Sequence, residues 1–540
     1  MSSAQRSARR PALASAALAI SGLLVESAAA VSVNVSFDAS VPLFELLPTY
    51  LSVNIDSGAL YQNFDFGDPV LTQLTRNLVR AAPMQLRVGG GAADNTYFTG
   101  VGGARGNCSV GGVFGVDTCV DAAYFSQLCA FAAASGAELV FDLNAALREP
   151  AAAATLGAWN ASNARSLFEF LSGPDAPAAC PLAAWQLGNE IEDWYKRRDE
   201  NGVPMNMSGQ AHAADLAALR SLLRSDFPSL QQTIYGPDAC CEDRAATPAG
   251  TWMRNFSAAA VGSVDAVTIH IYPLPRFANN SCEPPLFTNK SAMGSLIVAT
   301  LQYAEWSAAL LAAGAPLIVG ETATSAHGGC DGFSNRFVAG FTFWFELGTY
   351  AELGVAQINR QDLAGFSSET EPSNYVLLGP PGWARGELGD PHPDYFSALI
   401  FKQLVGRSVL KSGFTSDAAN VSEFVDVHVF CASGVGGGVV LTYFNMGQTA
   451  VEFSLPQLGA APVPREEFLL TSSALPGGAN ITADEIYLNG ERMAVNADGT
   501  LPAWPIRGRV AGDTAAAFVA PPWSYGAVSF PSAGAAACAA

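Results

Sequence analysis

Two glutamates stand at the ends of strongly apolar segments of the sequence. Glu190 follows Trp-Gln-Leu-Gly-Asn, and Glu321 follows Leu-Ile-Val-Gly. Burying an unpaired charge is expensive, so a carboxylate at such a place is either hydrogen-bonded or used in chemistry. A single glutamate at a strand end is more often a cap or one half of an ion pair. Two that face each other can act as nucleophile and as general acid/base, which is the chemistry of a retaining glycosidase.

The segments that carry these glutamates belong to a recurring pattern between residues 48 and 361. A short apolar, β-branched run ends in polar residues, and an Ala/Leu-rich helical stretch follows, as at 211–223 and 297–311. Continuous apolar runs of this kind suit parallel strands that are buried on both faces. We expect strands at 49–56, 84–91, 138–145, 183–190, 233–238, 264–272, 316–321 and 355–361.

Eight strand–helix units predict an α/β fold of the (β/α)8 TIM-barrel type. The alternative, a doubly wound open sheet, would carry a glycine-rich phosphate turn that opens a helix, whereas Gly89-Gly90-Gly91 leads into Ala-Ala-Asp-Asn. Chemistry in a barrel takes place at the C-terminal ends of the strands, and strands 4 and 7 face each other there. We therefore expect Glu190 and Glu321 to be about 5–5.5 Å apart, the separation typical of retaining glycosidases.

The pattern of apolar and polar residues changes near residue 405. Short, partly alternating strands separated by Gly/Pro turns occur at 425–431, 438–445, 451–455, 466–471 and 516–520. This pattern predicts a C-terminal β-sandwich domain. Residues 31–38 also alternate, and we expect them to join the sandwich. The predicted organisation is a signal peptide (1–30), an N-terminal strand segment (31–44), the catalytic barrel (45–404) and the sandwich (405–540).

The N-terminus and the sequons indicate a secreted protein. Three arginines precede an apolar stretch that ends in Ala28-Ala29-Ala30, which is the layout of a signal peptide, with an uncleaved signal anchor as the alternative. Ten cysteines suit an oxidising compartment. We expect an extracellular or a lysosome- or vacuole-like location, and no stable membrane span. Glycan acceptors are expected at Asn34, Asn107, Asn160, Asn206, Asn255, Asn279, Asn289, Asn420 and Asn480.

The chain is acidic, with a formal net charge of −20 over 540 residues. Its mean field repels nucleic acid and heavily sulfated polymers, and the one basic run is Lys196-Arg197-Arg198. This argues against nucleic acid as a partner but not against a locally anionic substrate. The five histidines show no ligand spacing, so we expect neither a metal nor another cofactor.

Several segments, taken together and in order, resemble glycoside hydrolase family 79, the heparanases and heparanase-like β-glucuronidases. They are LSVNID (51–56), LRVGG (86–90), DLNAALR (142–148), WNASNA (159–164), WQLGNE (185–190), YGPD (235–238), VTIHIY (267–272), VGET (319–322) and HPDYFSALIFKQLVGRSVL (392–410). The resemblance implies that Glu190 is the acid/base and Glu321 the nucleophile. It also implies that Asn189 binds the sugar 2-hydroxyl and that Tyr272 orients the nucleophile, although Tyr272 could simply pack in the core.

The same resemblance implies a site for glucuronic acid. Asp56 and Gln361 would contact the uronic acid ring. The backbone amides of Gly328 and Gly329, with the phenol of Tyr375, would bind its carboxylate. Two amides and a hydroxyl recognise an anion without adding net charge. An ordinary turn at the two glycines is the plainer alternative.

Other residues have competing interpretations. Lys196 matches the family's lysine six residues after the acid/base, but it could equally belong to a solvated basic face. Arg87 is interpreted as structural, holding the barrel mouth through ion pairs with Asp56 or Asp94. His270 is interpreted as a buried barrel histidine.

Two disulfides are suggested. Cys431 and Cys538 resemble the domain-closing disulfide of the family, which would stabilise the fold by about 2–5 kcal/mol. Cys108 with Cys119 is a local possibility, and the remaining cysteines stay unassigned.

The sequence also departs from the family. The connection from about 97 to 136 is glycine-rich and lacks a long excisable linker, the stretch after YGPD is acidic, and 366–373 is an insertion just before Asn374-Tyr375. The missing linker and the acidic stretch favour an exo-acting β-glucuronidase, and the insertion is expected to reshape the site for the sugar carboxylate. The alternatives are a heparanase-type endo-β-glucuronidase acting on heparan sulfate or a related extracellular polysaccharide, and an inactive carbohydrate-binding homologue.

Overall fold

The computed structural model describes twelve stretches of the chain: 30–112, 116–149, 156–196, 205–230, 233–240, 250–275, 282–366, 373–379, 391–459, 464–475, 480–511 and 517–539. The predicted signal peptide, up to residue 29, lies outside them, as does the sequon at Asn279. The side chains of Tyr195 and Lys196 are also outside the description.

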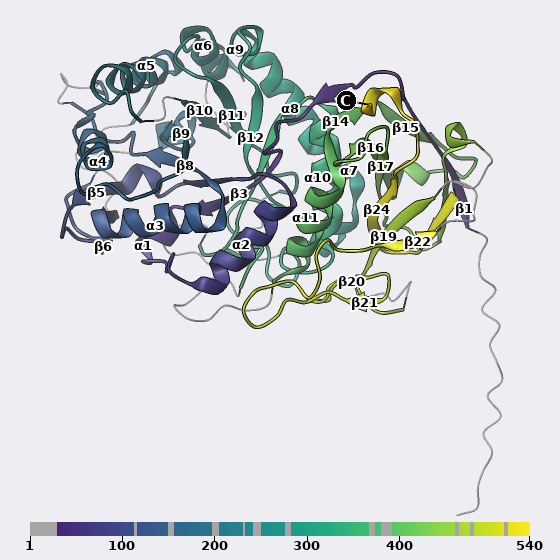
Figure 1. Cartoon of the computed structure of the whole chain (residues 1–540). Coiled ribbons are helices and arrows are strands. Elements are labelled where there is room, and N and C mark those ends of the chain that lie inside the picture. Colours follow the sequence, from purple (N-terminus) through teal and green to yellow (C-terminus); the bar gives the residue numbers. More distant parts are fainter. Residues whose placement is uncertain are drawn as a thin grey trace, which may run out of the picture.

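Eight parallel strands form one sheet in the first part of the chain (Figure 1). In spatial order they are β10, β11, β12, β13, β3, β4, β8 and β9. A parallel bridge between Trp185 and Ile234 joins β9 to the segment before β10 and closes the sheet into a barrel. The predicted (β/α)8 barrel is confirmed. The strands are β3 (Leu51–Asp56), β4 (Gln85–Gly89), β8 (Glu138–Leu143), β9 (Leu182–Leu187), β10 (Tyr235–Ala239), β11 (Ala266–His270), β12 (Leu317–Thr322) and β13 (Gln357–Arg360).

The strands are buried because helices cover their outer face and the strands' own side chains fill the interior. All residues of β3, β4, β11, β12 and β13 are buried. Several helices begin at the caps that the sequence provides, for example Asp68 before Pro69 in α2 and Ser208 before α5. The helices are α1 (Gly58–Tyr61), α2 (Pro69–Ala81), α3 (Ala122–Ser135), α4 (Ser162–Ser172), α5 (Gly209–Asp226), α6 (Thr251–Ala259), α7 (Lys290–Met293), α8 (Ser295–Trp306), α9 (Ala308–Ala312), α10 (Ala339–Glu352) and α11 (Pro393–Leu404).

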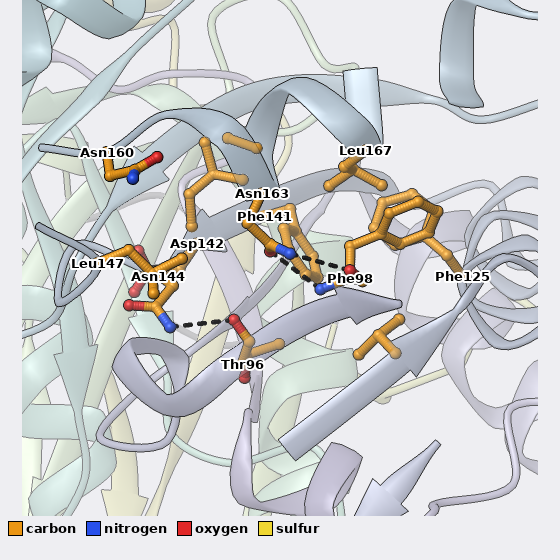
Figure 2. A pocket seen from close by; sticks show the side chains of 13 residues that line it. Thr96, Phe98, Phe125, Phe141, Asp142, Asn144, Leu147, Asn160, Asn163 and Leu167 are labelled. Atoms are coloured by element: carbon orange, nitrogen blue, oxygen red, sulfur yellow. Dashed lines mark hydrogen bonds between the residues drawn. The ribbon is translucent and has the colours of Figure 1, made fainter. Parts of the chain in front are cut away.

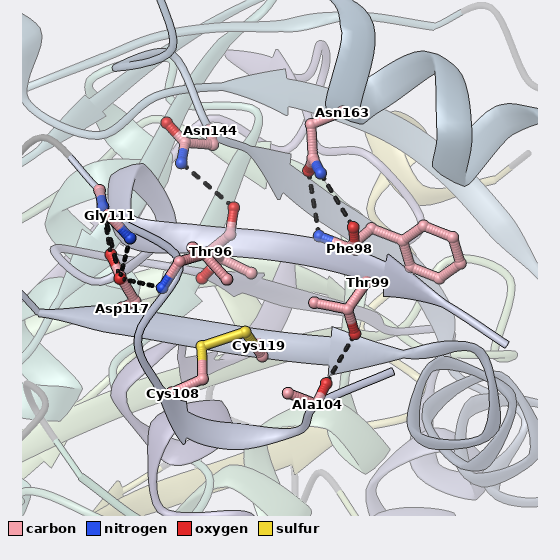
Figure 3. The surroundings of a disulfide bond; sticks show 12 residues. Thr96, Phe98, Thr99, Ala104, Cys108, Gly111, Asp117, Cys119, Asn144 and Asn163 are labelled. Carbon is pink, nitrogen blue, oxygen red and sulfur yellow. Dashed lines mark hydrogen bonds between the residues drawn. A yellow bond between two sulfur atoms is a disulfide. The ribbon is translucent and has the colours of Figure 1, made fainter. Parts of the chain in front are cut away.

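The glycine-rich connection after β4 contains a small sheet that the sequence pattern did not reveal. β5 (Thr96–Gly100) pairs with β7 (Asp117–Asp121), which also pairs with β6 (Gly106–Cys108). The Cys108–Cys119 disulfide links β6 to β7, so this local pairing is confirmed (Figure 3). Asp117 accepts backbone hydrogen bonds from Val110, Gly111 and Gly112 and thereby fixes the turn between the two strands.

Two further sheets form the second part of the molecule, and the predicted sandwich is confirmed. The larger one runs β2, β14, β16, β17, β24, β19, β20, β21, with β22 beside β19. Its strands are β2 (Phe44–Glu45), β14 (Val405–Leu410), β16 (Val425–Ala432), β17 (Val439–Asn445), β19 (Arg465–Thr471), β20 (Tyr487–Leu488), β21 (Glu491–Arg492), β22 (Arg509–Ala511) and β24 (Ser524–Phe530). The smaller sheet runs β15 (Ser412–Thr415), β1 (Val31–Phe37), β18 (Val451–Ser454) and β23 (Ala517–Ala520). The larger sheet is antiparallel, and the smaller one contains one parallel pair, β1 with β18.

The first strand of the chain lies in the sandwich rather than beside the barrel (Figure 1). β1 pairs with β15 and β18, and its side chains Val33 and Val35 are fully buried in the sandwich core. The chain then crosses to the barrel and returns after α11. The sandwich is therefore built from both ends of the described chain.

Helices α10 and α11 form the layer between barrel and sandwich (Figure 1). Every residue of α10 except Glu352 is buried, as expected for a helix that is covered on all sides. Its ring contacts reach into the sandwich: Phe341 lies against Tyr525 of β24, and the ring centroids are 5.2 Å apart. One apolar core accordingly runs from the barrel through this layer into the larger sandwich sheet.

Four disulfides join described cysteines: Cys108–Cys119, Cys129–Cys180, Cys282–Cys330 and Cys431–Cys538. The last confirms the pairing that the family resemblance implied. Within the described stretches, no helix combines the length and the apolar character needed to cross a bilayer.

Candidate active site

The two glutamates meet at the C-terminal end of the barrel strands. Glu190 comes three residues after the end of β9, and Glu321 is the last residue but one of β12. Together with His270 of β11 they form a cluster in which one side-chain atom from each residue lies within 4.8 Å of the others. The nearest oxygens of the two carboxylates are thus no more than 4.8 Å apart.

Glu321 is buried and held by three neighbours. Arg87 Nη1 donates to its Oε1 at 2.8 Å, and the Tyr272 hydroxyl donates to its Oε2 at 2.7 Å. His270 Nδ1 lies 3.7 Å from the same Oε2. Burial alone would raise the pKa of Glu321, but the charges of His270 and Arg87 outweigh it, so the pKa is lowered. Glu321 is therefore an ionised, oriented carboxylate.

Glu190 has a different environment. Its side chain keeps 29% of its surface exposed, against 7% for Glu321. Its backbone has φ of +51°, a left-handed conformation that is uncommon for a residue with a side chain. The amide of Glu190 donates to the carbonyl of Asp238 at 3.0 Å, which holds this conformation against the end of β10. Glu190 is the carboxylate that solvent or a leaving group can reach.

His270 is the site residue that the sequence interpretation missed. Its Nδ1 lies 2.9 Å from Glu190 Oε1, and its Nε2 lies 3.7 Å from Asp238 Oδ1. Burial lowers the pKa of His270, but Glu321, Asp238 and Glu190 raise it to about 10. The ring is an imidazolium between the two glutamates. The signal in the sequence was its place two residues before Tyr272, since residues at this spacing point to the same side of a strand.

Arg87 forms ion pairs at the barrel mouth, but not with the partners expected from the sequence. It contacts Asp238 at 2.9 Å and Glu321 at 2.8 Å, with Asp142 at 3.8 Å, in place of Asp56 or Asp94. The reason is strand alternation: Arg87, Asp142 and Asp238 all point into the barrel, where their side chains lie in one layer. Because Arg87 touches Glu321 directly, it belongs to the site.

Two more residues complete this buried network. Arg87 Nη2 donates to Asn189 Oδ1 at 2.9 Å, so the Asn189 amide nitrogen is the group left to donate elsewhere. Arg87 Nε donates to Gln186 Oε1 at 2.7 Å, and Gln186 Nε2 donates to Asp238 Oδ1 at 2.7 Å. Asp94 accepts from the Asn189 backbone amide at 3.1 Å, which supports the turn that carries Glu190.

Asp56 and Gln361 lie together at the ends of β3 and β13. Gln361 Nε2 donates to Asp56 Oδ2 at 3.1 Å, and Asn54 Nδ2 donates to Gln361 Oε1 at 2.7 Å. Both residues are buried, Asp56 at 3% and Gln361 at 1% exposure. The structure places this pair on the side of the mouth next to Tyr375, whose pKa is raised by burial and by Asp56 and Glu321.

The glycine pair lies in the loop after β12. Gly328 and Gly329 have φ of +79° and +72°, so both use the left-handed region that glycine tolerates. The Asn374 amide donates to the Gly328 carbonyl at 2.7 Å, which brings the following Tyr375 beside the loop. The Tyr375 ring stacks with that of Tyr272, with centroids 6.3 Å apart. The predicted carboxylate-binding residues are thus adjacent to one another and, through Tyr272, to Glu321.

The cluster of Glu190, His270 and Glu321 is the group of described residues that could be considered for a metal ion. A metal ion at this place would have to displace a proton from His270, whose pKa the surrounding carboxylates raise to about 10. The cluster is better understood as two carboxylates bridged by a cation.

A separate cavity lies beside the barrel, between β5, β8 and α4 (Figure 2). Asn163 pairs with the backbone of Phe98 through both ends of its amide, at 3.0 and 2.9 Å. Asn144 donates to the Thr96 carbonyl at 3.2 Å. These amides are occupied in holding β5 against the barrel, so this cavity supports the wall of the site and is not part of the mouth.

A (β/α)8 barrel with two close carboxylates at the ends of strands 4 and 7 is the architecture of a glycoside hydrolase. Residues 57–348 match the glycosyl hydrolase family 79 N-terminal domain. The chain belongs to glycosyl hydrolase family 79, as the sequence motifs predicted.

Individual relatives are distant. The chain is 28% identical to heparanase of Mus musculus over 405 residues, which are 74% of this chain and 67% of that one. It is 24% identical to baicalin-beta-D-glucuronidase of Scutellaria baicalensis over 405 residues, covering 71% and 68%. A 4-O-alpha-L-rhamnosyl-beta-D-glucuronidase from Fusarium oxysporum has a similar fold, with a TM-score of 0.61 and 14% identity over 92% of this chain and 100% of that one.

Proposed function

We propose that this chain is a retaining β-glucuronidase. The observation that carries the proposal is the pair of carboxylates whose nearest oxygens are no more than 4.8 Å apart. Retaining enzymes hold their two carboxyl groups about 5–5.5 Å apart, whereas inverting enzymes need roughly 6.5–9.5 Å to admit a water between them. The spacing supports direct attack by one carboxylate on the sugar.

The environments of the two carboxylates support a proposed division of roles. Glu321 is ionised and immobilised by Arg87 and Tyr272, which suits a nucleophile that attacks the anomeric carbon. Glu190 is more exposed, which suits a group that gives a proton to the leaving oxygen and later takes one from water. In the first step the Glu321 oxygen forms a bond to the anomeric carbon as the glycosidic bond breaks. In the second step water, deprotonated by Glu190, displaces Glu321 and restores both carboxyl groups.

Glucuronic acid is the proposed sugar. The backbone amides of Gly328 and Gly329 and the hydroxyl of Tyr375 would receive its carboxylate. Asp56 and Gln361 would contact the ring hydroxyls, and the free amide nitrogen of Asn189 would donate to the 2-hydroxyl. The names of two relatives support this choice: one is a baicalin-beta-D-glucuronidase, and the other is a heparanase. Lys196 remains a proposed contact whose side chain lies outside the described residues.

Two substitutions test the mechanism on an aryl β-glucuronide. Glu321→Ala should lower kcat by roughly 10³-fold or more, because it removes the nucleophile. Glu190→Ala should spare the first step when the leaving group is a good one, so a glycosyl-enzyme on Glu321 should accumulate and be visible by mass spectrometry. Glu305→Ala is the matched control, since Glu305 is an exposed partner of Arg254 far from the mouth. Near-normal turnover by Glu321→Ala would rule out this assignment.

Exo action is the proposed mode. The acidic charge of −20 and the acidic stretch that follows YGPD (235–238) disfavour a long sulfated chain. Size-exclusion analysis of digested heparan sulfate separates the two modes, because only an endo-acting enzyme shortens the polymer quickly. Rapid loss of chain length would favour the heparanase-type alternative.

We also propose that the protein passes through the secretory pathway. Of the eight sequon asparagines that the structure describes, Asn34, Asn107, Asn206, Asn289, Asn420 and Asn480 are exposed, and Asn160 and Asn255 are half-buried. Expression in a eukaryotic host followed by peptide N-glycosidase digestion should lower the apparent mass. An unchanged mass would contradict the proposal.

A further inference from the structure

The Cys282–Cys330 disulfide lies next to the proposed carboxylate-binding loop. Cys330 follows Gly328 and Gly329 directly and is fully buried. The Cα atoms of the two cysteines are 5.9 Å apart, a usual distance for a disulfide. The bond therefore ties the loop after β12 to the segment that follows β11.

Hydrogen bonds make the loop around Cys330 a single unit. The Cys330 amide donates to Ser334 Oγ at 2.8 Å, and Ser334 Oγ is 2.6 Å from Thr324 Oγ1. A Cβ added at Gly329 would lie 2.7 Å from Ser334 Oγ and 3.1 Å from the Tyr375 ring. The loop, Ser334 and Tyr375 consequently move together or not at all.

The other end of the disulfide is also anchored. Cys282 precedes the short helix η5 (Pro284–Thr288), in which Phe287 is fully buried. The Phe287 ring packs against that of Phe333, with centroids 5.2 Å apart. The disulfide thus attaches the loop to a packed segment and not to a free surface strand.

The nucleophile does not depend on this loop in the same way. Glu321 lies within β12, pairs with Arg87 of β4 and is held by two other barrel residues, Tyr272 and His270. Release of the loop after β12 would move Gly328, Gly329 and Tyr375. Tyr375 reaches the nucleophile only through its ring contact with Tyr272, and the contacts of Glu321 with Arg87 and His270 would stay in the barrel. Substrate binding and chemistry are separable here.

We propose that the Cys282–Cys330 disulfide is a specificity-determining element that holds the Gly328–Gly329 loop and Tyr375 in position for the carboxylate of an anionic sugar. The choice of glucuronate as that sugar rests on the proposed function. Donors that are already fixed bind an anion without a further ordering cost, so affinity for the carboxylate falls when the loop is freed. A neutral sugar without the carboxylate gains nothing from this order.

A second disulfide of the same protein provides the matched control. Cys129–Cys180 spans 51 residues and Cys282–Cys330 spans 48, so their effects on the entropy of the unfolded chain are nearly equal. Cys180 precedes the start of β9, which places the control bond toward the N-terminal end of the barrel strands, opposite the active site. The two bonds differ in position and hardly in loop length.

The test compares the double variants Cys282→Ser/Cys330→Ser and Cys129→Ser/Cys180→Ser with the full-length wild type. Each is assayed for kcat and KM on an aryl β-glucuronide and on the corresponding aryl β-glucoside, and each is melted to record Tm. We expect the first variant to raise KM for the glucuronide by roughly 10-fold or more, with kcat changed by less than about 3-fold. Its preference for glucuronide over glucoside should fall, while the control variant loses a similar amount of Tm and keeps its preference.

Other results overturn the proposal. An unchanged glucuronide KM in the first variant, or equal changes in both variants, would mean that the bond only stabilises the fold. If the serine pair does not fold, Cys282→Ala/Cys330→Val fills the same space without a bond and is judged by the same KM ratio. A wild type that hydrolyses the glucoside but not the glucuronide would refute the proposed function as well, which distinguishes the two failures.

Discussion

At the scale of single residues, the buried cations of the active site each face carboxylates. Arg87 and His270 are cations, and Glu321 and Asp238 are the anions that face them. Asp142 lies beside them in the same layer: burial and the nearby Asp238 raise its pKa well above the usual range, and Arg87, 3.8 Å away, opposes this rise. Because Arg87 and His270 are engaged by these carboxylates, the proposed binding of a sugar carboxylate would rely on neutral donors such as backbone amides.

His270 provides a prediction about pH. Burial raises the pKa of Glu321, and the imidazolium of His270 is the strongest influence that lowers it again. In His270→Gln that positive charge is gone, so the pKa of Glu321 should rise. The nucleophile then becomes protonated at a higher pH, and the acid limb of the kcat/KM profile on an aryl β-glucuronide should move toward neutral pH.

His392→Gln is the control for this experiment. His392 is a buried histidine whose Nδ1 lies 2.8 Å from the Val376 carbonyl oxygen. It is not one of the residues that hold Glu190 or Glu321. Its profile should keep the acid limb of the wild type. An acid limb that stays in place in His270→Gln would show that Arg87 and Tyr272 suffice to keep Glu321 ionised.

The comparison of sequence and structure is instructive at this scale. Glu190 and Glu321 could be found from the sequence because each ends a recognisable apolar strand. The roles of His270 and Arg87 could not, because each depends on partners from several other strands. Asp238 contacts both of them, although it lies 151 residues after Arg87 in the chain. Only the barrel register brings such residues into one layer.

At the scale of elements, the eight barrel strands were predictable from the sequence, whereas β24 of the sandwich and the small sheet of β5, β6 and β7 were not. Buried parallel strands are continuous apolar runs, and nothing else in the chain repeats them. β24 was missed although it lies at the centre of the larger sandwich sheet, between β17 and β19. Its sequence, SYGAVSF, has small residues and a glycine where a strand pattern needs large β-branched side chains. β5, β6 and β7 were missed because they are only three to five residues long, too short for a clear alternation, and lie in a glycine-rich connection.

Helix α10 depends on two glycines for its close packing on the sandwich. A Cβ at Gly348 would overlap the ring of His428 in β16, and one at Gly340 would overlap the hydroxyl of Tyr525 in β24. Alanine at either place gains up to about 1 kcal/mol in helix propensity. Overpacking costs roughly 1–3 kcal/mol, so the clash should prevail. We expect Gly348→Ala and Gly340→Ala each to lower Tm in thermal unfolding.

Gly413→Ala is the matched substitution for these variants. Gly413 lies in β15, and a Cβ there meets no atom within 4 Å. Its Tm should stay close to that of the wild type. A Gly348→Ala protein as stable as the Gly413→Ala protein would mean that α10 can shift away from β16 without loss.

At the scale of the whole molecule, a charged cluster joins the barrel to the sandwich. Lys290 of α7 pairs with Asp426 of β16 at 2.6 Å and donates to the Val425 carbonyl at 2.8 Å. His428 pairs with the same Asp426 at 2.8 Å and with Glu352 of α10 at 3.3 Å. Three elements, α7, α10 and β16, meet in this cluster. It adds a polar and directional contact to the apolar layer of α10 and α11.

The cluster makes stability depend on pH in a defined direction. Burial lowers the pKa of His428, but Asp426 and Glu352 raise it to about 10, against about 6.5 in the unfolded chain. A group whose pKa is higher in the folded state stabilises fully below the unfolded value, and this contribution fades as pH rises toward 10. His428→Gln should therefore lose the most stability at pH 6, of the order of 3–5 kcal/mol for a broken buried pair, and progressively less toward pH 10.

Denaturant unfolding of His428→Gln and the wild type between pH 6 and pH 10 measures this trend, and His392→Gln, followed from pH 7 down to about pH 5, supplies the opposite one. Burial lowers the pKa of His392, so its contribution is present above the unfolded value and is lost as the pH falls. The free-energy difference from wild type should shrink with rising pH for His428→Gln and with falling pH for His392→Gln. Parallel curves for both variants would show that His428 acts through its shape, with the barrel and the sandwich held together by the apolar layer alone.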